Sequence, residues 1–60
     1  MGYTVEITRT KTGEKSRNYY EDIEEVRRIM KNCVDWNRDN TDDRSTVRVL
    51  YKGKEIDRVD

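Results

Sequence analysis

An amphipathic segment, residues 21–38, places the strongest constraint on the fold of this chain. At about 100° per residue, the apolar side chains fall in one arc, and charged or polar side chains fill the opposite arc. The apolar arc contains Ile23, Val26, Ile29, Met30, Cys33, Val34, Trp36 and, as its polar member, Asn37. Acidic residues come first and basic residues follow, an order that suits the helix dipole. The pattern predicts one helix that buries this arc against the rest of the chain.

Polar residues mark both expected ends of this helix. Asp22 and Glu25 have the spacing of a capping box at the N-terminus. After the helix, residues 37–45 are polar and turn-prone, and Asn40 is the candidate for a left-handed residue that ends it.

The segments on either side of the helix have β-strand patterns. Apolar and polar side chains alternate in residues 3–8 and again in residues 47–51, as in strands with one buried face. Two shorter, charge-rich strands are expected after glycine-containing turns, at residues 15–20 following Gly13 and at residues 55–59 following Gly53.

The resulting order is ββαββ, an α+β fold in a single small domain, residues 1–60. The strands with the clearest apolar alternation, the first and third, belong in the middle of the sheet, because charge protects exposed edges. We therefore expect a four-stranded antiparallel sheet in the order 2-1-3-4, with the helix packed on one face after a right-handed crossover. The register of the second and fourth strands stays open, since each carries apolar residues of both parities.

The predicted core combines the apolar sides of the helix and of the two central strands. It comprises Tyr3, Val5, Ile7, Ile23, Val26, Met30, Cys33, Val47, Val49, Tyr51 and Ile56, flanked by Ile29, Val34 and Trp36. A chain of 60 residues buries only about 60% of the surface that its unfolded form exposes, so a stability of a few kcal/mol is expected.

The chain contains little that could carry catalysis. It has no histidine and one cysteine, and a core this small has no room for a ligand pocket of roughly 300 Å³ or more. Cys33 lies in the middle of the apolar arc and is expected to be an inert core thiol. We therefore expect no enzyme, no catalytic residue and no cofactor.

One run of oxygen-bearing residues partly matches a calcium-binding loop. Asp35, Asn37 and Asp39 match the first three ligand positions, but Asn40 replaces the sharp-turn glycine and Thr46 replaces the bidentate glutamate. We expect no metal site.

Charge is distributed unevenly although the chain is neutral overall. Residues 1–20 and 44–60 together carry a net charge of +4, and residues 21–43 carry −4. The acidic part could bind a basic partner protein through Glu21, Asp22, Glu24, Glu25, Asp39, Asp42 and Asp43. Dipole complementarity and a solvated loop account for most of the same residues.

The basic part suggests the alternative of nucleic-acid binding on the open face of the sheet. The residues in question are Arg17, Arg48, Lys52, Lys54 and Arg58. Glu6 lies in the middle of that face and dedicated stacking aromatics are missing, so an ordinary solvated face explains the pattern better.

Two apolar side chains are possible interface anchors. Trp36 lies at the edge of the apolar arc, where it either caps the core or stays partly exposed. Leu50 is expected on the open face of the sheet, where an apolar residue helps to contact a partner or a second copy. Exposure of both would favour a homodimer.

These observations favour a small non-catalytic protein-binding module, a regulator or inhibitor of the type that phages and mobile elements encode. It would act through the acidic helix and loop or by edge-strand pairing. One cysteine, no signal-like N-terminal pattern and no membrane-spanning apolar run favour a cytoplasmic setting without a membrane partner.

Overall fold

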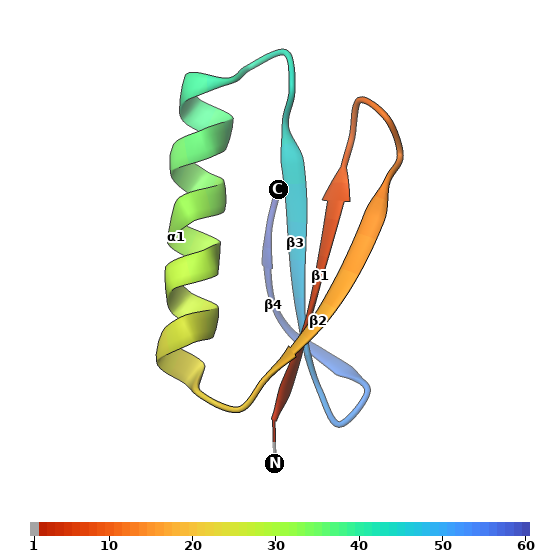
Figure 1. Ribbon diagram of the computed structural model, residues 1–60, viewed down its shortest axis with the longest axis vertical. Helices are drawn as coiled ribbons and strands as arrows, with labels where there is room; N and C mark the ends of the chain where they lie inside the picture. The colour runs from red at the N-terminus through yellow and green to blue at the C-terminus, as the bar shows by residue number, and fades with distance from the viewer. Residues whose placement is uncertain (1) are drawn as a thin grey trace.

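Five elements follow one another in the computed structural model, which describes residues 2–60 (Figure 1). They are β1 (Tyr3–Arg9), β2 (Lys15–Tyr20), α1 (Ile23–Asp39), β3 (Ser45–Tyr51) and β4 (Lys54–Val59). The four strands form one antiparallel sheet in the order β2-β1-β3-β4. The predicted α+β class, element order and sheet order are confirmed.

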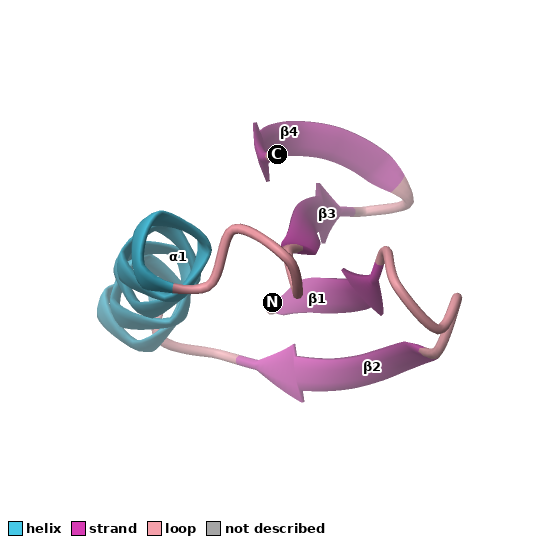
Figure 2. Cartoon of the chain, turned by 90° about the horizontal axis from the view of Figure 1, so that it is seen from above, coloured by secondary structure: helices cyan, strands magenta, loops and turns pink. Residues whose placement is uncertain are grey.

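The fold has two layers, the sheet and the helix. Figure 2 shows α1 on one side of the sheet, with the four strands stacked beside it. The helix packs chiefly against β3, and the face of the sheet that points away from α1 carries no other element between residues 2 and 60. Nothing helical in that range has the length and apolarity needed to cross a lipid bilayer.

Both ends of α1 are capped by side chains. The Asp22 carboxylate accepts a hydrogen bond of 2.9 Å from the backbone N–H of Glu24. At the other end, the backbone N–H and the side-chain amide of Asn40 both donate to the carbonyl of Trp36, at 2.8 and 3.0 Å. Asn40 has a φ of −126°, so the prediction of a left-handed residue there is wrong. Its side chain instead adds a second hydrogen bond to the Trp36 carbonyl, which the backbone N–H of Asn40 already bonds.

The structure resolves the register of the edge strands. Val5 lies between Asn18 of β2 and Val49 of β3, and the neighbouring rows on the same face are Tyr20–Tyr3–Tyr51 and Ser16–Ile7–Val47. Strand β2 therefore turns Ser16, Asn18 and Tyr20 toward α1, and Lys15, Arg17 and Tyr19 toward the open face.

The core is centred on four valines and the cysteine of α1. Val5, Val26, Cys33, Val47 and Val49 are buried. Around them pack Tyr3, Ile7, Tyr20, Ile23, Ile29, Met30 and Val59. Tyr20 and Val59, both from edge strands, were not in the predicted core. The sequence does not show which face of its strand each of them occupies.

Ile56 was predicted to be in the core, and this is wrong. Val49 pairs with Asp57, but the next residue of β3, Leu50, pairs with Glu55. Ile56 is therefore the extra residue of a β-bulge, and its side chain is 50% exposed.

Candidate protein-binding surface

Strand β2 presents an open edge of the sheet. The backbone N–H of Arg9 donates to the carbonyl of Glu14 at 2.9 Å, which makes this pair a hydrogen-bonded one. Hydrogen-bonded and non-bonded pairs alternate along an antiparallel ladder. The backbone groups that point away from β1 are therefore those of Lys15, Arg17 and Tyr19. All three residues are exposed, and the charges of Lys15 and Arg17 restrict this edge to a strand with complementary side chains.

Strand β4, at the opposite edge, is obstructed. The bulge at Ile56 interrupts its regular outline. The same alternation leaves the N–H of Arg58 facing outward, and there the Asp57 carboxylate accepts its hydrogen bond at 2.8 Å. Bulges and locally satisfied backbone groups protect a sheet edge from pairing. Of the two edges, β2 is the one that can accept a strand.

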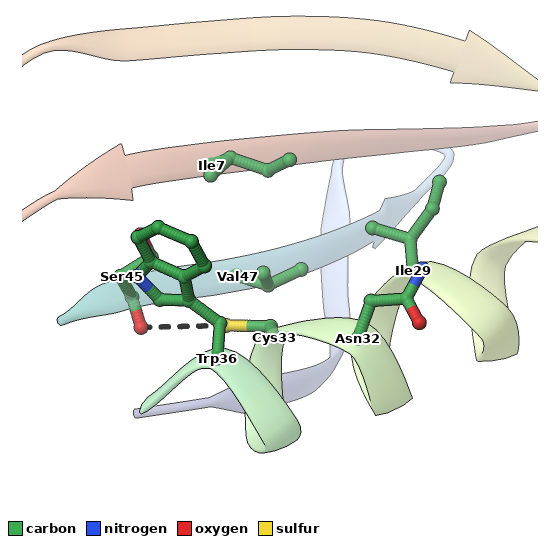
Figure 3. A pocket seen from close by; sticks show the side chains of 7 residues that line it. All are labelled: Ile7, Ile29, Asn32, Cys33, Trp36, Ser45 and Val47. Atoms are coloured by element: carbon green, nitrogen blue, oxygen red, sulfur yellow. Dashed lines mark hydrogen bonds between the residues drawn. The ribbon is translucent and has the colours of Figure 1, made fainter. Parts of the chain in front are cut away.

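An apolar groove lies between α1 and the central strands β1 and β3 (Figure 3). It has a volume of about 260 Å³ and is lined by Ile7, Ile29, Asn32, Cys33, Trp36, Ser45 and Val47. Figure 3 shows the α1 side chains facing those of β1 and β3 across it. A smaller hollow, of about 130 Å³, shares Ile7 and continues over Ser16 of β2. Because the serine side chain is short, apolar surface remains accessible next to the open edge.

Trp36 forms one end of this groove. The sequence left its role open between core and interface, and the side chain is 45% exposed. Its indole Nε1 donates a hydrogen bond of 2.6 Å to the backbone carbonyl of Asp43. The ring is thus held in place without being buried, as a preformed anchor would be.

The open face of the sheet is organised around a buried carboxylate. Glu6 is only 3% exposed and lies between Arg17 and Arg48 in the neighbouring strands. Arg17 donates to its Oε2 at 2.8 Å and Arg48 to its Oε1 at 3.2 Å. The hydrogen bond from Arg17 lowers the pKa of the Glu6 carboxyl and outweighs desolvation, which acts in the opposite direction. Much of the positive charge on this face is therefore neutralised within the sheet.

We expect Glu6→Gln to remove part of the acid sensitivity of the fold. Since the pKa of Glu6 is lowered by folding, its ionised form stabilises the protein above the ordinary carboxyl pKa of about 4. That contribution is lost as the pH falls through the lowered value. Urea midpoints measured from about pH 7 to about pH 2 should fall less in Glu6→Gln than in the wild type. Identical profiles for Glu6→Gln and the wild type would contradict the expectation.

The residues considered for nucleic-acid binding occupy two places. Arg17, Arg48 and Arg58 form a row across the open face, whereas Lys52 and Lys54 lie at the β3–β4 turn. Each arginine of the row contacts a carboxylate: Arg48 also bonds Glu55 at 2.8 Å, and Arg58 bonds Asp60 at 3.0 Å. A shallow hollow of about 250 Å³ on this face is lined by Glu6, Thr8, Lys15, Thr46, Arg48 and Arg58.

Leu50 lies on the open face, opposite Thr4, and is half-buried. Trp36 is on the other side of the sheet, in α1. The two candidate anchors therefore do not form one surface.

The acidic residues considered for partner binding fall into two groups at opposite ends of α1. Glu21, Asp22, Glu24 and Glu25 lie at its start, and Asp39, Asp42 and Asp43 at and beyond its end. A helix of 17 residues separates them by about 25 Å. Several have local partners: Asp22 caps the helix, Glu24 pairs with Arg27, Asp39 with Arg38, and Asp43 with Arg9. They are two small patches and not one acidic surface.

Asn37 has a structural role that the sequence analysis did not assign. It is 5% exposed, and its side-chain amide pairs with the backbone of Ser45 in both directions. Its Nδ2 donates to the Ser45 carbonyl and its Oδ1 accepts from the Ser45 N–H, both at 2.8 Å. The sequence does contain a sign of this role, because Asn37 is the one polar residue in the apolar arc of the helix.

Cys33, the single cysteine of the sequence, is buried. Cys33 donates a hydrogen bond of 3.4 Å to the Ser45 carbonyl, and burial raises the pKa of its thiol. A raised pKa keeps the sulfur protonated and poorly nucleophilic. Residues 2–60 contain no group of three or more His, Cys, Asp or Glu side chains placed to hold a metal ion.

No family model matches this chain, and no curated protein and no solved structure is significantly similar to it. Its function must be inferred from the surfaces described above. Among them, the β2 edge and the neighbouring apolar groove combine free backbone groups with exposed apolar area.

Proposed function

We propose that the protein is a non-catalytic cytoplasmic binding module that takes up an extended segment of a partner chain as an additional strand on β2. The observation that carries this proposal is the contrast between the two edges of the sheet. The outward backbone groups of Lys15, Arg17 and Tyr19 are exposed in a regular strand, whereas β4 is bulged and partly capped. In strand addition, main-chain hydrogen bonds supply affinity and alternate side chains supply specificity.

The surroundings of β2 indicate which side chains the partner segment would carry. On the side of α1, the hollow over the small residue Ser16 adjoins the apolar groove at Ile7. Apolar side chains at every second position of the segment fit this side. On the open side, the added strand would lie next to Lys15 and Arg17, which favours polar or acidic side chains there.

A module of this kind would act by holding a strand that the partner otherwise uses itself. The regulator or inhibitor role follows from that mode of action. By analogy, we place it with the small regulators that phages and mobile elements encode.

Backbone amide exchange of the isotopically labelled protein tests the proposal residue by residue. The probe is a set of heptapeptides selected from a random displayed library for binding to the immobilised protein. In the monomeric protein without peptide, the amides of Lys15, Arg17 and Tyr19 should exchange fast, and those of Ser16 and Asn18 slowly. Peptide binding should protect the first three selectively. Protection confined to α1 or to the acidic loop would overturn the proposal.

Substitutions at the two edges supply matched controls. Tyr19→Pro removes an outward N–H and should abolish peptide binding, whereas Tyr19→Ala, which keeps the N–H, should retain much of it. Arg58→Pro makes the equivalent change at the obstructed edge and should leave binding unchanged. Equal binding by Tyr19→Pro and Tyr19→Ala would contradict strand addition.

Nucleic-acid binding is the alternative function, and the open face supports it less well. The three arginines in its central row are paired with Glu6, Glu55 and Asp60. Fluorescence anisotropy with labelled single- and double-stranded DNA would reveal such binding. For each phosphate contact, a tenfold increase in salt would lower the logarithm of the DNA-binding constant by about 0.7 to 0.9.

A further inference from the structure

We infer that a second copy of this chain supplies the strand that β2 accepts, so that two β2 strands pair antiparallel about a two-fold axis at Asn18. This inference rests on the proposed role of β2 as a strand acceptor and adds a second copy as a strand that it accepts. That strand carries Ser16, Asn18 and Tyr20 on the α1 side, in place of the alternating apolar side chains that fit a peptide there. The register that the β2 edge allows and the charges at the two ends of β2 support this dimer.

Symmetry restricts the possible registers. A two-fold axis perpendicular to the sheet keeps each face of one copy on the same side as that face of the other. Residues that face each other across the interface must then share a face. The axis therefore passes midway between one β2 residue and the same residue of the second copy. The outward backbone groups of Lys15, Arg17 and Tyr19 must also meet outward groups of the second copy.

Charge selects among these registers. An axis at Arg17 would place two guanidinium groups opposite each other, and an axis at Ser16 would place Lys15 opposite Arg17, both repulsive. An axis at Asn18 places Lys15 opposite Glu21, which directly follows β2, and Arg17 opposite Tyr19. An axis at Tyr19 would also pair opposite charges but would leave the first half of β2 without a partner strand.

The pair that this register creates consists of two side chains that form no salt bridge within one copy. In the structure of residues 2–60, neither Lys15 nor Glu21 takes part in a salt bridge, and both are exposed. The two-fold axis generates the Lys15–Glu21 pair twice, once at each end of the interface. On the α1 side, Asn18 faces Asn18 of the second copy, and Ser16 faces Tyr20.

The assembly closes after two copies. Pairing of both β2 edges joins two four-stranded sheets into one continuous sheet, with both α1 helices on the same face. The outer edges of that sheet are the two obstructed β4 strands, which do not recruit further copies. One strand per copy is a small contact, so the dimer is expected to be weak and concentration-dependent.

Sedimentation velocity of the full chain, from about 10 µM to about 1 mM, tests the dimer directly. The wild type should shift from monomer toward dimer over this range. Lys15→Glu and Glu21→Lys each place like charges opposite one another at two sites, and each should weaken dimerisation by about tenfold. The double variant Lys15→Glu/Glu21→Lys restores opposite charges and should return to within about twofold of the wild type. Circular dichroism checks that every variant is folded.

Three outcomes would overturn the inference. They are a wild type that is monomeric at every concentration, single variants that dimerise as well as the wild type, and a double variant that stays as weak as the singles. The peptide experiment separates this failure from that of the proposed function. If the protein stays monomeric but peptide protects the amides of Lys15, Arg17 and Tyr19, the dimer inference is wrong and the proposal that β2 accepts a strand is retained. If the protein stays monomeric and no peptide protects these amides, both the dimer inference and the proposed strand acceptance are wrong.

Discussion

Replacement of Asn37 by alanine is expected to lower the free energy of unfolding by about 2–3 kcal/mol, a large part of the roughly 3–5 kcal/mol that a domain of this size holds. The Asn37 amide makes two hydrogen bonds of 2.8 Å to the backbone of Ser45. Alanine would leave the N–H of Ser45 without this acceptor at the partly buried start of β3. The cost of such an unsatisfied group exceeds the net gain from an ordinary hydrogen bond.

Asn32→Ala is the matched control for this substitution. Asn32 lies on the same helix and is exposed, so the identical chemical change should alter stability by no more than about 0.5 kcal/mol. Urea denaturation followed by the fluorescence of Trp36, the single tryptophan, measures both variants. Similar midpoints for Asn37→Ala and Asn32→Ala would show that the Asn37–Ser45 pairing contributes little.

Asn37→Asp distinguishes the hydrogen bonds from the volume of the side chain. Aspartate has nearly the same size and keeps an acceptor for the Ser45 N–H, but it loses the donor and turns a negative charge toward the Ser45 carbonyl. We expect it to be at least as destabilising as alanine at neutral pH. The effect should diminish as the carboxyl is protonated at low pH.

The position of Asn37 connects stability to the proposed binding surface. It joins the last turn of α1 to the first residue of β3, and the neighbouring Trp36 is bonded to Asp43 in the loop between them. Ser45 also lines the apolar groove. Loss of the Asn37 pairing is therefore expected to loosen the end of the groove beside Trp36 before the sheet itself unfolds.

The elements that were predicted correctly have strong periodic patterns. Alternation in β1 and β3 and the apolar arc of α1 determined the strand and helix assignments, and charge on β2 and β4 determined the sheet order. In β2, two adjacent tyrosines, Tyr19 and Tyr20, left the parity undecided. The structure shows that Tyr20 packs on the core and Tyr19 is 61% exposed. The error at Ile56 has a different cause, since a β-bulge changes parity within a strand and leaves no periodic signal.

Less of the candidate site could be predicted, because it depends on the backbone. The outward amides of β2 are set by which residue pairs of the β1–β2 hairpin are hydrogen-bonded and which are not. The side chains in the sequence do not show this alternation. The acidic residues form two sequence clusters, and only the length of α1 shows that they lie at opposite ends of the molecule. Glu6 was recognised as an acidic residue in a basic face, but its burial between Arg17 and Arg48 follows from the register alone.

The pair Val26→Ala and Val34→Ala is expected to give the clearest measure of how much the α1–sheet interface stabilises the fold. Both valines lie in α1, so the gain in helix propensity from alanine is similar at the two positions. Val26 is 1% exposed and belongs to the core, whereas Val34 is 50% exposed. The difference between the two variants therefore isolates burial.

Val26→Ala removes two methyl groups from a packed site and leaves a cavity, which should cost about 2–3 kcal/mol before a propensity gain of about 0.5 kcal/mol. Val34→Ala should be neutral or slightly stabilising, because its side chain is half in solvent already. Urea denaturation at neutral pH should thus separate the two variants by about 2 kcal/mol or more. Equal stabilities would mean that α1 is not packed on the sheet in solution. The apolar groove between them, and with it the specificity proposed for the β2 edge, would then have no basis.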